Sequence, residues 1–439
     1  MATLLMIESW MRSTGQALPG VIARLGHRYV LFTRDPDLYP ASQAGAPHPV
    51  VAGAETVVRV DTNDLDALVA EATSLARRER IDGVLTTCDY YLEAVATVAE
   101  ALRLPGPPAE VMRLATRKHR VRQALAEAGV AGPRFAVASG WEECLVTAAE
   151  IGYPLVAKPT DRNAGTAVRR VDGEAALKDA FWEITGDTHN TRGQPLERVV
   201  LLEELLDGPE VSVEAVTCHG GTTIVGVTDK SVTGPPSFVE SGHMFPADLD
   251  PDAATGVEDH VRRALDALGF THGLSHTEVK LTAHGPRIVE INPRQAGGYI
   301  FELIHLVTGT HPLEILIELS LGHVPSIGTD TAPVLSAEPP AASAAIMFLL
   351  SPRDGTVIAV DGTERLVGDP TVTRWTAPVP TRVRYPRSND DYLGHVVAVD
   401  HHGRRARALA ERAVGGLLLR FDDGDAVAPA GVPSGVVAR

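Results

Sequence analysis

The first 102 residues alternate short apolar runs with longer segments in which apolar residues recur at helical spacing. The runs predict strands and the periodic segments predict helices. Strands are expected over residues 4–7, 29–33, 56–60 and 83–87, and helices over residues 16–25, 64–80 and 92–102. This rhythm is typical of a parallel sheet covered by helices. No G-x-G-x-x-G pattern follows the first strand, so it does not indicate a dinucleotide cofactor.

Composition limits the functions open to the chain. Its 439 residues exceed one ordinary core, so roughly two to four domains are expected. A net charge of −16 disfavours non-specific binding to nucleic acids and anionic membranes. No run of about 18 apolar residues occurs, and the N-terminus lacks the basic segment of a signal peptide. Three widely spaced cysteines (Cys88, Cys144 and Cys218) fit reduced thiols, and a cytoplasmic protein is expected.

A second organisation follows the Pro-rich residues 104–108. Ser139 and Glu142 have the spacing of a capping box, which would open a helix ending near residue 151. The pattern further predicts helices over residues 109–115, 117–128 and 175–184, and strands over residues 153–158, 167–171 and 199–203.

Residues 160–166 connect two of these strands and directly follow Lys158, at the end of a buried run. Small residues in such a loop, here including Gly165 and Thr166, let backbone N–H groups approach an anion. The arrangement therefore suits a flap that covers phosphate groups. An ordinary hairpin is an equally good interpretation, because the loop contains a single glycine.

Residues 203–206 form an acidic strand end followed by a short apolar link. The backbone of such a link can pair with a purine edge, and the carboxylate of Glu210 can accept two hydrogen bonds from a ribose diol. The alternative is a strand and turn with acids at the surface.

Oxygen ligands gather near residue 290. Glu290 and Asn292 are two positions apart, so on a strand they share a face. A turn at residues 284–286 would bring Glu278 beside Glu290. Such ligands suit Mg²⁺, which combines a few protein oxygens with phosphate oxygens, and Arg294 can grip a phosphate by a bidentate fork. The pattern predicts a phosphoryl-transfer site, with a solvated hairpin of scattered charges as the alternative.

These motifs, in this order from about residue 85 to residue 298, resemble those of the ATP-grasp enzymes, most closely the L-amino-acid ligases and related carboxylate–amine ligases. The resemblance implies that ATP is held by two lysines, a phosphate loop, an adenine hinge and a ribose carboxylate: Lys118, Lys158, Gly165, Thr166, Glu203, Glu204, Leu206 and Glu210. It implies Mg²⁺, with Mn²⁺ as a substitute, on Glu278, Glu290 and Asn292. It also implies that three residues flank the reacting carboxylate: Arg294, Gly297 and Gly298.

Three features depart from the family pattern. Arg117 precedes the first lysine, where an acid is usual. Glu204 follows the hinge glutamate, where many members have lysine, although that position offers adenine mainly backbone atoms. The phosphate loop is poor in glycine, which leaves its contacts open.

Four residues are candidates for substrate contact. His243 lies in the segment between the ribose region and the metal strand, where it would orient substrate or accept a proton from an amine. A structural loop histidine is the alternative. Asp89 and Tyr90 follow a predicted strand at its C-terminal end, where open α/β sheets place ligands. His276 precedes the metal strand and is a candidate for the pocket wall.

The resemblance implies an α/β protein in three parts. These are a Rossmann-like preATP-grasp domain over residues 1–108, an ATP-grasp core over residues 109–340 with a mobile flap at about 134–200, and a C-terminal α+β domain over residues 341–424, followed by a tail over residues 425–439.

The implied activity is ADP-forming ligation of a carboxylate to an amine through an acyl-phosphate, with an amino acid among the substrates. The expected partners are small-molecule carboxylates and amines, without nucleic acid or membrane, and a homodimer is compatible with this reading. Two alternatives remain: a biotin- or bicarbonate-dependent carboxylase of the same superfamily, and a non-catalytic ATP-binding module.

Overall fold

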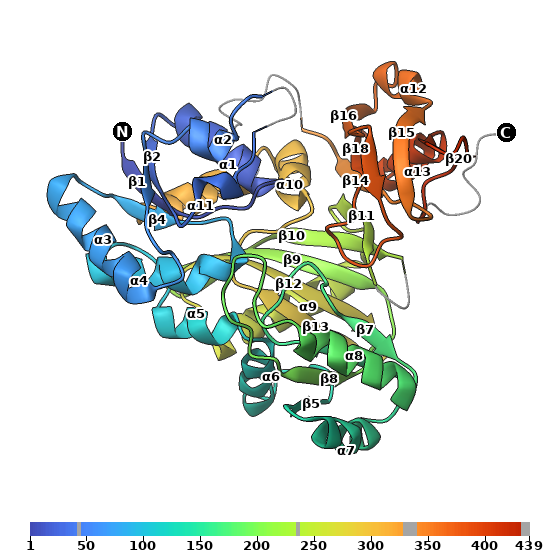
Figure 1. Cartoon of the computed structure of the whole chain (residues 1–439), viewed down its shortest axis with the longest axis horizontal. Coiled ribbons are helices and arrows are strands. Elements are labelled where there is room, and N and C mark those ends of the chain that lie inside the picture. Colours follow the sequence, from blue (N-terminus) through green and yellow to red (C-terminus); the bar gives the residue numbers. More distant parts are fainter. Residues whose placement is uncertain (42–44, 234–237, 328–339, 432–439) are drawn as a thin grey trace.

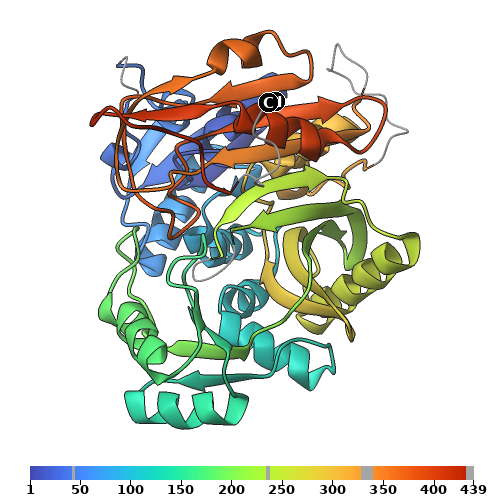
Figure 2. The same cartoon turned by 90° about the vertical axis from the view of Figure 1, so that its right-hand side faces the viewer.

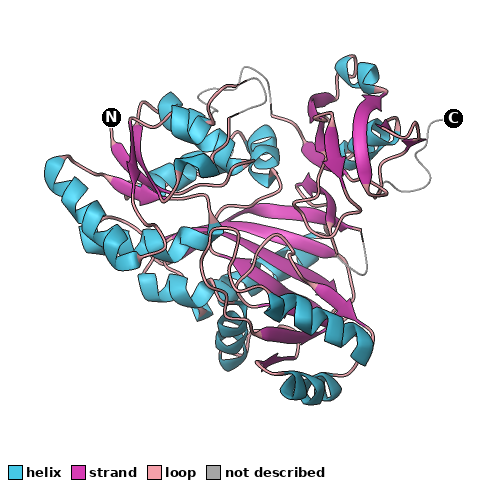
Figure 3. Ribbon diagram, in the orientation of Figure 1, coloured by secondary structure: helices cyan, strands magenta, loops and turns pink. Residues whose placement is uncertain are grey.

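The computed structural model describes residues 1–41, 45–233, 238–327 and 340–431 (Figure 1). Within these ranges the strands form four sheets, and helices cover them on their outer faces (Figure 3). The result is an α/β fold, as the sequence predicts.

The N-terminal sheet is parallel, with strand order β3-β2-β1-β4. Its strands are β1 (Thr3–Ile7), β2 (Arg28–Thr33), β3 (Thr56–Arg59) and β4 (Gly83–Leu85). The helices are α1 (Thr14–Arg24), α2 (Pro49–Ala52), α3 (Leu65–Arg78) and α4 (Leu92–Leu102), with 3₁₀ turns η1 (Pro36–Leu38) and η2 (Asp89–Tyr91). The predicted alternation of strands and helices is confirmed.

Two helices from much later in the chain complete this N-terminal core. They are α10 (Ile300–Thr308) and α11 (Pro312–Ser320), and Phe301, Leu313 and Ile317 join the cluster that buries β1. Figure 1 shows α11 beside the N-terminal strands. Across the described ranges no single helix is long and apolar enough to cross a membrane, although this pair, bent by 99°, passes that test on length and composition.

The central sheet is antiparallel and has the order β13-β12-β9-β10-β11-β14-β18-β16. Its first five strands are β9 (Glu210–Cys218), β10 (Gly221–Val232), β11 (Glu240–Phe245), β12 (Gly273–Thr282) and β13 (Gly285–Asn292). One hydrophobic cluster packs four of them, β9, β10, β12 and β13, against α5 (Ala109–Ala115), α6 (Lys118–Glu127) and α9 (Pro251–Ala267).

The flap has a sheet and a core of its own. Its elements are β5 (Phe135–Ala138), α7 (Trp141–Ile151), β6 (Leu155–Pro159), β7 (Arg169–Val171), α8 (Glu174–Gly186) and β8 (Val200–Glu204). The predicted capping box is wrong. Gly140 is the N-cap of α7 and offers no side-chain cap, while Glu143 accepts a hydrogen bond from the Ser139 N–H at 2.9 Å.

The C-terminal part extends the central sheet through β14 (Ser343–Leu349), β16 (Val372–Thr376) and β18 (Gly394–Asp400). A second sheet and two helices cover this extension: β15 (Gly355–Asp361), β17 (Thr381–Val383), β19 (Leu418–Phe421), β20 (Ala426–Val427), α12 (Thr363–Val367) and α13 (Ala406–Gly415). Figure 2 shows this part on the opposite side of the central sheet from the flap. Strand β20 lies within the predicted tail, so the start of that segment is structured. Residues 432–439 lie outside the described ranges.

A glycine in β4 tests the packing of α11 on the N-terminal sheet. A Cβ added at Gly83 would lie 2.5 Å from the Ser320 carbonyl oxygen, whereas one added at the exposed Gly20 of α1 would meet no atom within 4 Å. We expect Gly83→Ala to lower the free energy of unfolding by about 1–3 kcal/mol through overpacking. Gly20→Ala should raise it by about 0.5–1 kcal/mol, because alanine suits a helix interior better. Urea denaturation of both variants measures the two changes, and equal effects would contradict the packing.

Candidate functional site

The predicted hairpin that carries the acids is present. Strands β12 and β13 pair antiparallel, with Glu278 opposite Glu290 and His276 opposite Asn292. Glu290 and Asn292 are two positions apart on β13, so their side chains leave the strand on one face. The two carboxylates and the amide therefore occupy neighbouring positions of one hairpin.

Two lysines from different segments reach this hairpin. Lys118 is the first residue of α6, and its Nζ lies 3.3 Å from Glu290 Oε1. Lys158 is on β6, and its Nζ donates a hydrogen bond to the Val289 carbonyl at 3.4 Å. Both lysines that the resemblance assigned to ATP thus approach the strand of the predicted metal ligands. Paired cations beside acidic residues are suited to binding a metal-bound polyphosphate.

Glu203 lies in the middle of a buried charge cluster. Its carboxylate is 2.6 Å from Lys158 Nζ and 2.5 Å from Arg122 Nε, and these side chains are at most 5% exposed. Burial opposes ionisation of Glu203, but the neighbouring Arg122 and Lys158 outweigh it and lower its pKa. The side chain of Glu203 is therefore committed to protein contacts, and its backbone lies between β5 and β6 in the flap sheet.

Four further predicted nucleotide contacts lie at the end of β8 and in the phosphate loop, and these residues are half-buried or exposed: Glu204, Leu206, Gly165 and Thr166. Glu204 forms an ion pair with Arg134 at 2.7 Å, and Leu206 follows in the half-buried link to β9. In the phosphate loop, Gly165 has a φ of +66°, a left-handed conformation that favours glycine. Thr166 closes this turn with a hydrogen bond from its N–H to the Asn163 carbonyl at 3.0 Å.

The phosphate loop contacts both ends of the chain. The Tyr90 hydroxyl donates to Asn163 Oδ1 at 3.0 Å, which connects the loop to the N-terminal part. The Asn389 N–H donates to the Ala164 carbonyl at 3.2 Å, which connects it to the C-terminal part. Tyr90, a predicted substrate contact, thus lies beside the predicted phosphate loop.

A buried lysine on β10 links three acids of the site. Lys230 Nζ lies 2.5 Å from Glu278, 2.8 Å from Glu240 and 3.3 Å from Glu210, and its side chain is 1% exposed. Burial disfavours its charge, but the three carboxylates outweigh burial and raise the pKa of Lys230 well above its usual range. The predicted ribose carboxylate Glu210 and the predicted metal ligand Glu278 therefore share one counter-ion.

His276 also holds Glu278. Its Nδ1 lies 2.9 Å from Glu214 Oε1, and its Nε2 lies 3.4 Å from Glu278 Oε1. Burial would lower the pKa of His276, but the charge and hydrogen bonds of Glu214 and Glu278 outweigh burial and raise it to about 9. In Glu278, burial is likewise outweighed by Lys230 and His276, so its pKa is lowered and it is an anion at neutral pH.

The residues after the metal strand meet the N-terminal part. Arg294 forms an ion pair with Asp89, whose second carboxylate oxygen accepts a hydrogen bond from Trp10 Nε1 at 2.8 Å. Next in the chain, Gly297 leads to Gly298, which has a φ of +56°. A Cβ at Gly298 would lie 2.6 Å from the Nε2 atom of His243, so a glycine is required there. The structure thus brings Asp89 to Arg294, and His243 to Gly298.

His243 is buried with two unpaired ring nitrogens. Neither nitrogen has a hydrogen-bond partner in the described part of the chain, and the side chain is inaccessible to solvent. Nε2 approaches Glu240 Oε2 at 3.4 Å without hydrogen-bond geometry. Because leaving a buried polar group unpaired costs about 1–3 kcal/mol, such groups are typical of places where a polar ligand supplies the missing partner.

The donors at the hairpin fit a magnesium ion that is shared with a nucleotide. Among the described residues, no group of three or more His, Cys, Asp or Glu side chains is arranged to hold a metal. Glu278, Glu290 and Asn292 instead offer two carboxylates and an amide. Mg²⁺ usually takes one or two protein carboxylates and completes its shell with phosphate and water oxygens.

Comparison with known proteins identifies the family. Three domain families match the chain: the ATP-grasp N-terminal domain over residues 23–106, the ATP-grasp domain over residues 151–302, and the L-amino acid ligase C-terminal domain 2 over residues 347–422. The uncharacterized protein y4rH of Sinorhizobium fredii is 30% identical over 413 residues, which cover 94% of this chain and 81% of that protein. The chain belongs to the ATP-grasp superfamily. It is an ATP-dependent carbon–nitrogen ligase.

Relatives and solved structures agree with this membership. The alanine–anticapsin ligase of Bacillus amyloliquefaciens is 24% identical over 58% of this chain, and the match spans 57% of that ligase. The L-amino acid ligase of Bacillus licheniformis has the same fold, with a TM-score of 0.77, 22% identity and coverage of 96% of this chain and 99% of the other. The biotin carboxylase domain of Hydrogenobacter thermophilus 2-oxoglutarate carboxylase, solved with MgADP, has a TM-score of 0.68 at 16% identity, with coverage of 95% of this chain and 90% of the other.

Several residues of this ATP-grasp site were not identified from the sequence: Trp10, Arg122, Lys230 and Glu240. Of these four residues, only Lys230 could have been recognised from the sequence. A single lysine within a long strand rich in β-branched residues is unusual unless it pairs with an acid. Arg122 occurs in an ordinary charged helix, and its partner Glu203 is 81 positions away. Nothing local distinguishes it from a surface arginine.

The raised pKa of His276 predicts a pH-dependent contribution to stability. With a folded-state pKa of about 9 and an ordinary value near 6.5, the protonated histidine stabilises the fold fully below about pH 6.5. The contribution is lost as the pH rises through about 9. We expect the difference in unfolding free energy between wild type and His276→Gln to shrink steadily from pH 6.5 to pH 9.5 in urea titrations. A difference that is independent of pH would show that the imidazole is neutral.

Proposed function

We propose that this protein is an ADP-forming ligase that joins a carboxylate to an amine through an acyl-phosphate, with an amino acid as at least one substrate. One observation carries the proposal. The hairpin of Glu278, Glu290 and Asn292 has lysines against it on the flap side, and the Asp89–Arg294 pair follows it directly in the chain. A nucleotide site and a site for a second anion are therefore adjacent.

In this proposal, ATP lies between the flap and the central sheet. Lys118 and Lys158 contact its phosphates, the backbone of Gly165 and Thr166 covers them, and the adenine meets the backbone from Glu203 through Glu204 to Leu206. Glu210 accepts hydrogen bonds from the ribose. Glu278, Glu290 and Asn292 would hold Mg²⁺, which would supply positive charge against the transferred phosphoryl group. The support is the convergence of both lysines on β13.

The chemistry then needs positioning more than a nucleophilic side chain. Arg294 holds the substrate carboxylate, one oxygen of which attacks the γ-phosphorus while the bond to the β-phosphate oxygen breaks and ADP leaves. The amine attacks the resulting acyl-phosphate at carbon, phosphate leaves, and the amine proton passes to a base. Backbone N–H groups at Gly297 and Gly298 support the oxyanion. His243, with unpaired ring nitrogens beside Gly298, is the proposed base.

The amino-acid substrate is supported by two features. The C-terminal part matches the L-amino acid ligase C-terminal domain 2 over residues 347–422, which favours a ligase over the carboxylase alternative. Asp89 also places a carboxylate beside Arg294, and such a pair can receive the ammonium and carboxylate groups of one amino acid. A non-catalytic ATP-binding module would be expected to have lost metal ligands, whereas Glu278, Glu290 and Asn292 are all present.

Product analysis tests the proposed reaction. Purified protein with ATP, Mg²⁺ and pooled amino acids should release ADP and phosphate in equal amounts, with an amide product visible by mass spectrometry, because attack falls on the γ-phosphorus. Stoichiometric AMP and pyrophosphate would refute the acyl-phosphate route. Turnover that requires bicarbonate and biotin, and that ignores amino acids, would instead support the carboxylase.

The metal assignment predicts the effect of one substitution. Glu290→Gln keeps the shape of the side chain but removes its charge, so turnover should fall by at least about 10²-fold, comparable to the loss of a key electrostatic group. Glu258→Gln, which breaks a surface ion pair with Arg262 on α9, is the matched control and should keep wild-type activity. Phosphate release and thermal melting of both variants check this. A folded Glu290→Gln enzyme with near-normal turnover at saturating Mg²⁺ would show that the assignment is wrong.

A further inference from the structure

A segment of the flap reaches across to the N-terminal sheet. Residues 188–197, here called the strap, connect α8 to β8. Asn190 organises its turn: the Asn190 Oδ1 atom accepts hydrogen bonds from the N–H groups of Arg192 at 2.9 Å and Gln194 at 3.1 Å. Asn190 Nδ2 donates to Gln194 Oε1 at 2.8 Å. The strap is therefore pre-shaped to present Arg192 away from the flap.

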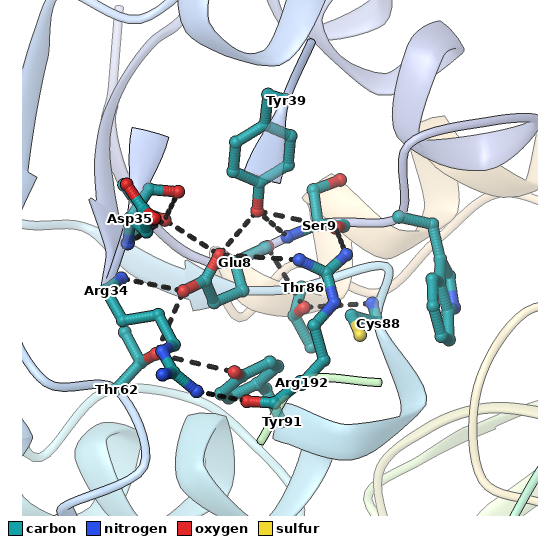
Figure 4. Close-up of polar contacts among 12 residues, drawn as sticks. Glu8, Ser9, Arg34, Asp35, Tyr39, Thr62, Thr86, Cys88, Tyr91 and Arg192 are labelled. Carbon is teal, nitrogen blue, oxygen red and sulfur yellow. Dashed lines mark hydrogen bonds and ion pairs between the residues drawn. The ribbon is translucent and has the colours of Figure 1, made fainter. Parts of the chain in front are cut away.

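The side chain of Arg192 is buried in the N-terminal part and is 3% exposed (Figure 4). Its Nη2 donates to the Ser9 carbonyl at 2.6 Å, and its Nη1 lies 4.0 Å from Glu8 Oε2. The guanidinium carbon lies 5.4 Å from the centre of the Trp10 ring and 5.8 Å from that of Tyr39, within the range of cation–π attraction. One arginine of the flap thus fills a socket at the end of β1.

The backbone of the strap is fixed at the same place. The Arg192 carbonyl accepts hydrogen bonds from Asn63 Nδ2 at 2.9 Å and from the guanidinium of Arg34. Both donors belong to the N-terminal part, on the loops that follow β2 and β3. Side chain and backbone together hold the strap in one position against the N-terminal sheet.

The socket itself does not depend on Arg192. The carboxylate of Glu8 accepts hydrogen bonds of 2.5–2.9 Å from four groups of the N-terminal part: Thr33 Oγ1, the Arg34 N–H, the Tyr39 hydroxyl and Thr62 Oγ1. Because these bonds satisfy the buried acid, removing Arg192 leaves no acceptor of Glu8 without a partner. An Arg192 variant should therefore retain the fold of the N-terminal sheet.

Two routes run from the strap to the Asp89–Tyr90 turn. In the first, Trp10 lies against the Arg192 guanidinium and donates its indole N–H to Asp89, which pairs with Arg294. In the second, Gln194 Nε2 donates to the Tyr90 carbonyl at 3.0 Å. Asp89 and Tyr90 are therefore held from the strap on both sides. Asp89 is the residue through which the N-terminal part meets Arg294.

We propose that Arg192 is a positioning residue, which orients Arg294 for the reacting carboxylate through Trp10 and Asp89. This inference rests on the proposed function, in which Arg294 holds that carboxylate. The strap belongs to the same flap as Lys158, and the Arg192 contacts fasten this flap to the N-terminal sheet. Arg192 thus acts on the carboxylate side of the site, where the acyl-phosphate must form away from water.

The test compares Arg192→Ala with Arg169→Ala in the full-length enzyme. Arg169 lies on the same flap, where it pairs with Glu183.

For Arg192→Ala, we expect kcat/KM for the carboxylate substrate to fall at least about tenfold, because a misaligned reacting group lowers the rate by this order. Affinity for ATP, measured by calorimetry, should stay within about twofold of wild type, because the contact of Lys158 with Glu203 is intact. The Arg192→Ala variant should also release more phosphate per amide formed, because a misaligned acyl-phosphate is hydrolysed more often before the amine attacks it. Arg169→Ala should match wild type in all three measurements.

Milder variants keep the test decisive if Arg192→Ala folds poorly. Gln194→Ala removes the hydrogen bond to the Tyr90 carbonyl and the contact with Asn190 Nδ2 but leaves Arg192 in place. Arg192→Lys keeps the charge but lacks the planar fork. Both should raise the ratio of phosphate to amide, and guanidinium ion should restore part of the rate of Arg192→Ala.

Two results would overturn the inference. One is wild-type kcat/KM and coupling in these variants with only a lower melting temperature, which would leave the strap a structural tie. The other is a parallel loss of ATP affinity, which would place the effect at the nucleotide. A wild-type enzyme that forms no amide would instead refute the proposed function itself.

Discussion

Lys230 is the shared counter-ion of three carboxylates that the fold gathers at the centre of its largest sheet. Glu210, Glu240 and Glu278 come from three strands, β9, β11 and β12, and all approach the ammonium group on β10. Burying this many acids without a cation would be prohibitive, since breaking a buried ion pair by removing one partner costs about 3–5 kcal/mol. The strand order brings these side chains together, because β9 and β11 flank β10 and β12 lies beside β9.

A local concentration of basic side chains explains how an acidic protein can bind a polyanion such as ATP. The net charge of −16 would repel ATP at long range, yet basic side chains are concentrated at the edge of the hairpin. Lys118, Lys158 and Arg294 belong to three separate segments, and each lies against a residue that the fold also fixes. Their charges are therefore oriented before a ligand arrives, which is the condition under which electrostatic stabilisation in a buried site is most effective.

Sequence patterns predicted the elements of this fold better than the partners within it. Apolar runs located the N-terminal strands, and the turn at residues 284–286 located the hairpin of Glu278 and Glu290, because these signals are local. The capping box at Ser139 failed because a cap depends on the backbone angle of one residue. The pairing of Asp89 with Arg294 joins residues 205 positions apart, and no local pattern carries that information.

The three parts of the chain meet at the phosphate loop, and this limits how the site can be assembled. The loop bonds to Tyr90 of the N-terminal part and to Asn389 of the C-terminal part, while β11 pairs with β14, so the central sheet continues into the C-terminal part. A C-terminal part built on the same sheet cannot move independently of β11, which carries Glu240 and His243. The flap is different, since it has its own sheet and its own core. Within the described residues, a movement of the flap against the remaining fold would therefore open the nucleotide side and leave the cluster around Lys230 intact.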